Sequence, residues 1–445
     1  MKIDVHSVFA ILFLAGTCFA ESSLPSAIPP YYRVRFDPST QAGELVYAVS
    51  YTIWIPPSAK TLRGVIVHQH GCGDGACKGG QTAAFDLHWQ ALAQKHECAL
   101  LGPSYEQPDG SDCGLWCDPR NGSESKFLLA LDELSKQSGH PELVTVPWAL
   151  WGHSGGAAWV GTLLMLKPER VVAVWLRSGT PRLATRADSN LPLLEIPDTA
   201  LKVPVMCNLG TEEGVTVTDG RFSKVWTTVE TFFKDFRGKG GLIGVAIDPK
   251  SSHDCGNSRY LAIPWFDTCL TERLPQNFGD ALRPMPTDNA WLATLLEKQS
   301  QAARLFNGDL SSSVWIPNER IAKAWEQYVT DGNVSDSTPP PAPTNLKLIG
   351  NILTWEATAD FESGIAGFIV ERNGVELARI PEKPRKSIGR QIFQTNSYHD
   401  TPVLPLSEMN FIDAAATTNE RFKYSVRTVN SSLLKSESSS IVTSP

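Results

Sequence analysis

The sequence has no excess of basic residues and no long apolar run after its first twenty residues. Its 445 residues include 40 lysines and arginines against 47 aspartates and glutamates, a formal net charge of −7 at pH 7. Nucleic acids and anionic membranes are bound through basic patches, so this balance argues against both as partners. No segment is long and apolar enough for a membrane span. The composition predicts a globular protein.

The first twenty residues resemble a secretory signal. Residues 8–15 form an apolar core, and Ala20 suits cleavage before Glu21. We therefore expect a secreted protein, extracellular or periplasmic. Cys18 follows a sequence similar to a bacterial lipid-attachment box, which leaves lipidation as an alternative.

The chain has nine cysteines, of which eight would remain after cleavage of the signal. An even number fits an oxidising compartment, so we expect disulfides, with no pairing predicted. A zinc site that combines Cys72 and Cys77 with Cys113 and Cys117 is the weaker alternative, because these spacings are not C-x-x-C. We expect no metal and no organic cofactor.

A proline-rich linker at residues 336–344 separates two regions of different pattern. Residues 21–335 alternate strand-like and helix-like segments, which predicts an α/β domain: a mostly parallel sheet with helices on both faces. The expected strands are 45–55, 64–68, 98–101, 146–151, 171–176, 203–209 and 242–247.

Residues 345–445 read as short strands and predict a small all-β sandwich. Asn373-Gly374 is a hairpin turn signal. The region resembles a fibronectin type III domain, with Trp355 and Tyr424 at the positions of its core tryptophan and late-strand tyrosine. We expect this domain to be a spacer or to dock a polymer or glycan, rather than to take part in catalysis.

A G-x-S-x-G pattern, Gly152 to Gly156, lies between a β-prone apolar run and a helix-like apolar run. Strand, tight turn and helix form the context of a nucleophile elbow, so Ser154 is the candidate nucleophile of an α/β-hydrolase fold. A serine of this kind needs a histidine base, an acid to orient that base, and N–H donors for the oxyanion.

Histidine is scarce, with nine in the chain, and only His253 and His399 lie beyond Ser154. Because the chain order of this fold is serine, acid, histidine, and because His399 belongs to the predicted sandwich, His253 is the candidate base.

The acid should follow a strand end between Ser154 and His253. Hydrolases of this fold often place it three residues after a turn glycine, which indicates Glu213. Glu212 could serve instead. Asp219 and Asp248 are weaker candidates, because Asp219 lies further from the strand end and a proline closely follows Asp248.

The oxyanion donors are expected from two backbone N–H groups. One is Gly155, after the nucleophile; the other is Cys72, with Gly73 second, in the loop after the strand at 64–68. His70, at the start of the same loop, and Trp116, in a cysteine-bracketed loop, are the candidate substrate-binding residues.

Residues 70–72, 113–116 and 152–156 together resemble the secreted polyhydroxybutyrate-depolymerase and feruloyl-esterase group of α/β-hydrolases, over about residues 45–260. The resemblance implies a serine esterase that forms an acyl-enzyme on an ester substrate, polymeric and carbohydrate-linked esters included. Two departures are Gly155, where the group has a small residue followed by two glycines, and an acid that is Glu instead of Asp. A peptidase of the same fold and a non-catalytic binding or adhesion protein are the alternatives.

Overall fold

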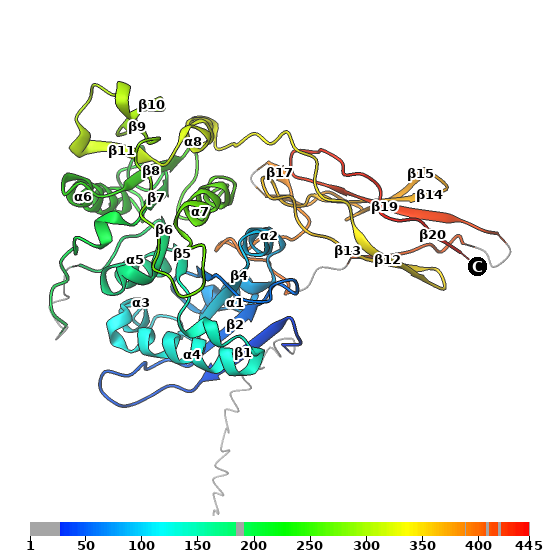
Figure 1. The fold of residues 1–445 in the computed structure, drawn as a ribbon, viewed down its shortest axis with the longest axis horizontal. Helices are drawn as coiled ribbons and strands as arrows, with labels where there is room; N and C mark the ends of the chain where they lie inside the picture. Colours follow the sequence, from blue (N-terminus) through cyan, green and yellow to red (C-terminus); the bar gives the residue numbers. More distant parts are fainter. Residues whose placement is uncertain (1–26, 184–190, 388, 406–408, 417–419, 445) are drawn as a thin grey trace, which may run out of the picture.

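The computed structural model describes residues 27–183, 191–387, 389–405, 409–416 and 420–444. The secretory signal expected over residues 1–20 lies outside these ranges. Figure 1 shows two parts, a rounded α/β domain and an elongated C-terminal sandwich that carries the C-terminus at its far end. Among the described residues, no helix has the length and apolar character needed to cross a membrane.

The α/β domain is built on an eight-stranded sheet in the order β1-β2-β4-β3-β5-β6-β7-β8. Strands β3 to β8 run parallel, and β1 and β2 join antiparallel at one edge. The strands are β1 (Tyr31–Phe36), β2 (Val49–Trp54), β3 (Gly64–Gln69), β4 (Cys98–Tyr105), β5 (Trp148–His153), β6 (Val171–Arg177), β7 (Val205–Gly210) and β8 (Ile243–Asp248).

All seven strands expected for this domain are present, which confirms the predicted fold class. The central strands are buried on both faces, and this is why they read as continuous apolar runs. The sequence analysis missed β1, an edge strand whose apolar residues are interrupted by Arg33 and Arg35.

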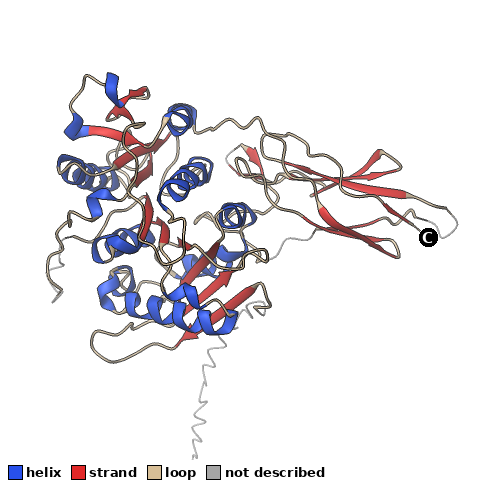
Figure 2. Cartoon of the chain, viewed as in Figure 1, coloured by secondary structure: helices blue, strands red, loops and turns tan. Residues whose placement is uncertain are grey.

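Helices cover both faces of the sheet (Figure 2). On one side α2, α7 and α8 pack together, and α5 and α6 lie on the other (Figure 1). The helices are α1 (Asp74–Thr82), α2 (Leu87–Lys95), α3 (Gly114–Cys117), α4 (Ser123–Ser138), α5 (Gly155–Leu166), α6 (Lys224–Gly238), α7 (Arg259–Arg273) and α8 (Glu319–Asp331). A small antiparallel sheet beside β8 contains β9 (Trp291–Thr294), β10 (Ser300–Ala302) and β11 (Ser313–Ile316).

The C-terminal sandwich consists of two antiparallel sheets that share a core, as predicted. Trp355 is buried in that core with its ring edge-on to Phe368, at a centroid distance of 5.4 Å. One sheet contains β12 (Thr344–Ile349), β13 (Ile352–Glu356) and β18 (Asn410–Ile412). The other contains β14 (Gly367–Arg372), β15 (Val375–Ile380), β19 (Lys423–Val429) and β20 (Val442–Thr443), and β16 (Lys386–Ser387) pairs separately with β17 (Arg390–Gln391). The expected turn at Asn373-Gly374 joins β14 to β15, and both residues have positive φ.

Residues 396–401, called here the 396–401 segment, leave the sandwich after β17 and lie against the α/β domain (Figure 1, orange). Its main anchor is Asp400, which is only 3% exposed. The guanidinium of Arg259, at the start of α7, donates to Asp400 Oδ1 at 2.7 Å and to Asp86 Oδ2 at 2.7 Å. Trp89 Nε1 donates to Asp400 Oδ2 at 3.3 Å. The two parts of the chain therefore meet through a buried ion-pair network and not through a flexible tether alone.

Electrostatics at this anchor favour the charged forms. Burial on its own lowers the pKa of Arg259, but Asp400 and Asp86 more than offset that effect and raise it above its ordinary value. Burial likewise raises the pKa of Asp400, and Arg259 brings it below its ordinary value. Each charge is thus stable in the interior only while its partner is present.

We expect Asp400→Asn to lower the free energy of unfolding by about 3 kcal/mol, because removal of one partner leaves a buried charge short of compensation. The measurement is the urea midpoint of the full chain. Glu376→Gln is the matched control, since it breaks an exposed pair with Arg379 on the sandwich and exposed pairs contribute little. Equal midpoints for the two variants would contradict the prediction.

Candidate active site

Ser154 lies at the tight turn between β5 and α5 with a φ of 55°, a strained value for a residue other than glycine. Its backbone N–H donates to the carbonyl of Arg177 at 2.7 Å, which ties the turn to β6. A Cβ on Gly152 would collide with the backbone of Gly156, and a Cβ on Gly156 with the carbonyl of His70. The two outer glycines of the pattern are therefore required by close backbone approach.

The structure brings Ser154, His253 and Glu213 into one hydrogen-bonded row. His253 Nε2 lies 2.9 Å from Ser154 Oγ, and His253 Nδ1 lies 2.5 Å from Glu213 Oε1. A carboxylate only accepts, so Nδ1 carries the ring proton and Nε2 presents its lone pair to the serine hydroxyl. This is the arrangement in which a histidine can take the proton of an attacking serine.

Glu213 is held by its second carboxylate oxygen. The side chain is fully buried, and Oε2 accepts from the backbone N–H of Gly210 and from the hydroxyl of Ser178, each at 2.7 Å. The neighbouring Glu212 is exposed and Asp219 is exposed. Of the four acids considered from the sequence, Glu213 is the one whose carboxylate contacts His253.

Asp248, the remaining acid candidate, is buried and faces Arg177, with Oδ2 3.8 Å from Nη1. Burial raises the pKa of Asp248, and Arg177 partly offsets that rise. Asp248 therefore pairs with Arg177 and is not the acid that orients His253.

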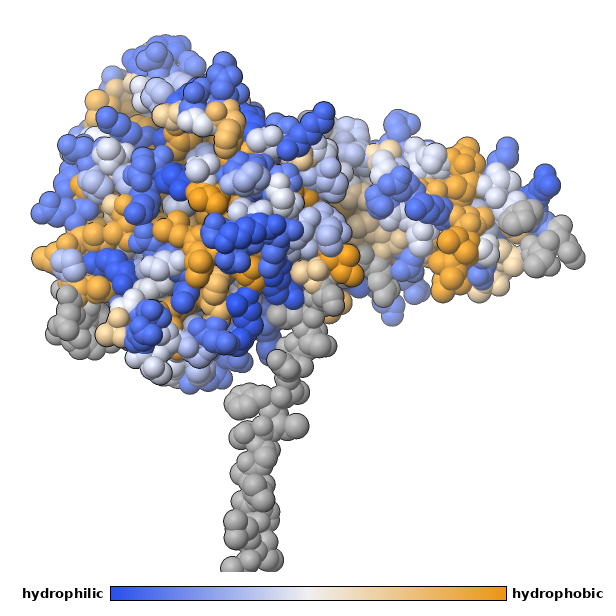
Figure 3. All heavy atoms as spheres, turned by 60° about the horizontal axis from the view of Figure 1, so that its bottom comes forward, coloured by the Kyte–Doolittle hydropathy of each residue, from blue (hydrophilic) through white to orange (hydrophobic). Residues whose placement is uncertain are grey.

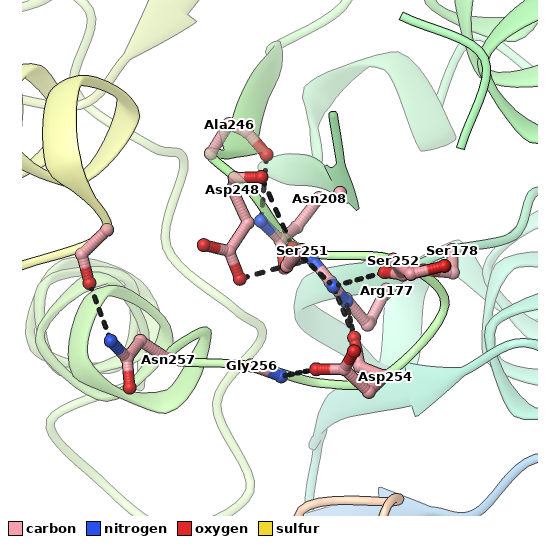
Figure 4. A network of polar contacts seen from close by, with 12 residues as sticks. Arg177, Ser178, Asn208, Ala246, Asp248, Ser251, Ser252, Asp254, Gly256 and Asn257 are labelled. Carbon is pink, nitrogen blue, oxygen red and sulfur yellow. Dashed lines mark hydrogen bonds and ion pairs between the residues drawn. The ribbon is translucent and has the colours of Figure 1, made fainter. Parts of the chain in front are cut away.

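Arg177, fully buried at the end of β6, holds the loop that carries His253 (Figure 4). Its Nη2 donates to the carbonyl of Ser252 at 3.1 Å, and its Nε to the carbonyl of Asp254 at 2.9 Å. A single guanidinium therefore fixes the carbonyls on both sides of His253. The sequence analysis missed Arg177, although an arginine that ends an otherwise apolar strand is a signal that could have found it.

Phe222 is a second residue that the sequence analysis missed. Its ring stacks on the imidazole of His253 at a centroid distance of 3.9 Å and an interplanar angle of 4°. An aromatic face packed flat against the imidazole restricts the rotation of the ring.

The two expected oxyanion donors lie close together. Gly155 begins α5, where backbone N–H groups have no partner within the helix. A Cβ on Gly155 would collide with Cys72 Sγ and would lie 3.5 Å from Cys72 N. Between the two candidates in the loop, Gly73 donates its N–H to Gln107 Oε1 at 3.2 Å, which favours Cys72.

Cys72 is disulfide-bonded to Cys113, with a Cα–Cα distance of 5.7 Å. The bridge ties the loop after β3 to the residues before α3. The other six cysteines among the described residues are buried and unbridged: Cys77, Cys98, Cys117, Cys207, Cys255 and Cys269. The disulfide prediction is met by one pair, and that pair uses two of the four cysteines of the zinc alternative.

The structure does not place His70 and Trp116 where a substrate could contact them. His70 is 1% exposed; its Nδ1 is bonded to the carbonyl of Gly71, and its Nε2 accepts from the N–H of Tyr105. Burial lowers the pKa of His70 to about 3, so the ring is neutral and braces the loop. Trp116 is fully buried, stacks on Tyr105 and donates to Gln107. The expectation that Trp116 binds substrate is therefore wrong, because Trp116 is a core tryptophan.

One group of acidic side chains among the described residues is close enough together to share a cation: Asp336, Asp360 and Glu362. It belongs to the linker and the C-terminal sandwich. All three carboxylates already accept hydrogen bonds there, Asp336 and Asp360 from Asn430 among others and Glu362 from Thr338.

No family model matches the chain, and no curated protein matches it in sequence. Among solved structures it is similar to a thermostable esterase, at 15% identity and a TM-score of 0.35, over 51% of this chain and 56% of that one. It is also similar to an S-formylglutathione hydrolase from Agrobacterium tumefaciens, at 17% identity and a TM-score of 0.34, over 55% of this chain and 96% of that one. A siderophore hydrolase from Aspergillus nidulans matches at 15% identity and a TM-score of 0.34, over 56% and 93%. Sequence identities and TM-scores this low carry no argument about activity.

We expect Gly155→Ala to lower the rate of serine labelling by a fluorophosphonate by about 10²-fold, because the new Cβ would push the Cys72 sulfur and its N–H away from the oxyanion position. Gly238→Ala is the control, since a Cβ there meets nothing within 4 Å. If Gly155→Ala were labelled as fast as the wild type, the N–H groups of Gly155 and Cys72 would not need to lie this close together.

Proposed function

We propose that the chain is a secreted serine hydrolase that cleaves carboxylic esters. The observation that carries the proposal is the row of hydrogen bonds from Ser154 Oγ through His253 to Glu213. The expected oxyanion donors support it too, because Gly155 directly follows the serine and the backbone nitrogen of Cys72 lies 3.5 Å from where a Cβ on Gly155 would be. A site with a nucleophile, a base, an orienting acid and oxyanion donors is the full set that acyl transfer requires.

In the proposed reaction, Ser154 Oγ attacks the ester carbonyl while His253 Nε2 takes the hydroxyl proton. The carbonyl oxygen becomes an oxyanion, which the N–H groups of Gly155 and Cys72 stabilise. Glu213 stabilises the imidazolium without taking its proton. His253 then donates the proton to the departing alcohol oxygen, which leaves an acyl-serine. Water then attacks the acyl-serine while the same Nε2 takes its proton. His253 returns that proton to Ser154 Oγ as the acyl–oxygen bond breaks, which releases the acid and restores the site.

Secretion rests on the apolar segment near the N-terminus and on the disulfide. The Cys72–Cys113 bridge lies in the loop that would supply an oxyanion donor. Such bonds persist in oxidising compartments such as the periplasm or the extracellular space. A reducing cytosol would open a bond on which the proposed site depends.

We infer in addition that the C-terminal sandwich, the fibronectin type III-like part, docks a polymer that carries the ester. Figure 3 shows apolar side chains grouped on this domain. Ile349 pairs with Ile352 and Ile352 with Ile412, so the three lie on one face of their sheet. They are 74%, 42% and 56% exposed, which favours an apolar polyester over a glycan.

We expect Ser154→Ala to lower kcat for a p-nitrophenyl ester by about 10⁶-fold and to abolish labelling by a fluorophosphonate, because Ser154 Oγ forms the acyl bond in the proposed reaction. Turnover of amides but not of esters by the wild type would favour the peptidase alternative. A wild type that neither turns over nor labels would favour a binding protein.

The adjacent residues Glu212 and Glu213 allow a matched comparison in the same ester assay. Glu213→Gln should lower kcat by about 10⁴-fold, because the amide stabilises the wrong ring tautomer of His253. Glu212→Gln alters an exposed side chain one residue away and should leave kcat unchanged. Equal effects would remove Glu213 from the proposed role.

We expect Ile352→Ser to weaken adsorption to polyester particles, because it interrupts the exposed row of isoleucines. Turnover of a soluble ester should stay at the wild-type value. Adsorption is measured by depletion from solution, with insoluble xylan as the contrasting surface. Undiminished adsorption of Ile352→Ser would contradict docking through this face.

A further inference from the structure

The 396–401 segment of the C-terminal domain reaches the residue that precedes the candidate nucleophile. His399 Nδ1 lies 2.9 Å from His153 Nδ1, although 246 positions separate the two residues in the chain. His153 is fully buried, and its Nε2 lies 2.7 Å from the backbone carbonyl oxygen of His253. Two hydrogen bonds therefore connect the C-terminal domain to the backbone of the candidate base.

The chemistry of the groups fixes the direction of both bonds. The carbonyl of His253 can only accept, so His153 Nε2 carries a proton and donates it. Burial, with smaller effects of His399, His253 and Arg177, holds the pKa of His153 well below its ordinary value, so this ring is neutral. Its Nδ1 is then an acceptor, and the donor must be Nδ1–H of His399. Burial, with smaller effects of His253 and His68, lowers the pKa of His399 to about 4, which keeps it neutral as well.

The His153–His399 pair adds to the hydrogen bonds that fix the backbone of the loop carrying His253. Arg177 donates to the carbonyls of Ser252 and Asp254, and His153 donates to the carbonyl of His253 between them. Three consecutive carbonyls are thus fixed by hydrogen bonds. The third bond is the one that depends on a residue outside the α/β domain, because the ring of His153 is oriented by His399.

The 396–401 segment makes two further contacts near the site. The carbonyl of Tyr398 accepts from the N–H of Cys255, at 3.4 Å. A Cβ on Gly71 would lie 3.2 Å from the His399 ring, so His399 packs against the loop that supplies the Cys72 N–H. His399 therefore contacts structure on both the base side and the oxyanion side of Ser154.

We propose that His399 is a positioning residue of the catalytic site, and that the C-terminal domain is thereby a required part of the catalytic unit. The proposal rests on the proposed ester hydrolysis, to which it adds a residue that acts through His153. The proton donated by His399 Nδ1 fixes the tautomer and orientation of His153, and His153 in turn fixes the backbone of His253. An error of about 1 Å at the base is enough to cost about 10²-fold in rate.

The test compares His399→Leu with His399→Asn, two side chains of similar shape. The amide nitrogen of asparagine stands where Nδ1 of histidine stands and can donate to His153, whereas leucine cannot. We expect His399→Leu to lower kcat for a soluble ester by about 10- to 100-fold with KM nearly unchanged, and His399→Asn to keep most of the activity. If the leucine variant does not fold, His399→Ala replaces it in the same comparison.

Two measurements separate positioning from stability. His140→Gln is the control variant, because it alters a half-buried histidine that is bonded to Glu142 outside the site. Thermal unfolding of each variant shows whether activity simply follows stability. The NMR resonance of His253 Nδ1–H, in its bond to Glu213, reports the geometry of the base without any substrate.

The outcomes are distinct. Wild-type kcat in His399→Leu, or equal losses in the leucine and asparagine variants, would overturn the proposal. A shifted or broadened His253 resonance in the leucine variant that asparagine restores, together with the kcat pattern, would support it. A wild type with no ester turnover and no labelling would overturn the proposed function instead, and the resonance would then still decide whether His399 positions His253.

Discussion

The candidate active site depends on the placement of one loop that has no regular structure. His253 lies between β8 and α7, yet its ring must meet Ser154 on one side and Glu213 on the other. The fold meets this requirement by bonding the backbone of the loop as well as the ring. Arg177 and His153, from the ends of the neighbouring strands β6 and β5, donate to its carbonyls. The rigidity of the sheet is thereby transferred to the base.

The sequence was sufficient for the features that are local in the chain. The elbow at Ser154 is encoded by its own glycines, and Glu213 by its distance from the turn at Gly210. Phe222 and the His153–His399 pair were missed because their roles come from contacts between distant segments. Arg177 has a local signal, its place at the end of an apolar strand, but its partners are also distant in the chain. Trp116 was misassigned for a related reason: an aromatic residue in a loop between cysteines gives no sign of which way it faces.

The departure at Gly155 has a physical cause in the disulfide. A side chain larger than hydrogen after the serine would occupy the space of Cys72 Sγ. The glycine and the Cys72–Cys113 bridge are therefore coupled features of one oxyanion loop.

The buried ion pair of Arg259 and Asp400 fixes the position of the C-terminal sandwich relative to the α/β domain. An apolar interface tolerates small shifts, because burial of apolar area has no preferred direction. A shift here would instead separate Asp400 from Arg259 and leave charges unpaired in the interior, a cost of several kcal/mol. Asp400 directly follows His399, so the ion pair that holds the sandwich in place also sets the ring of His399 beside His153. The C-terminal sandwich is thus attached to the α/β domain by the same segment that brings His399 beside His153.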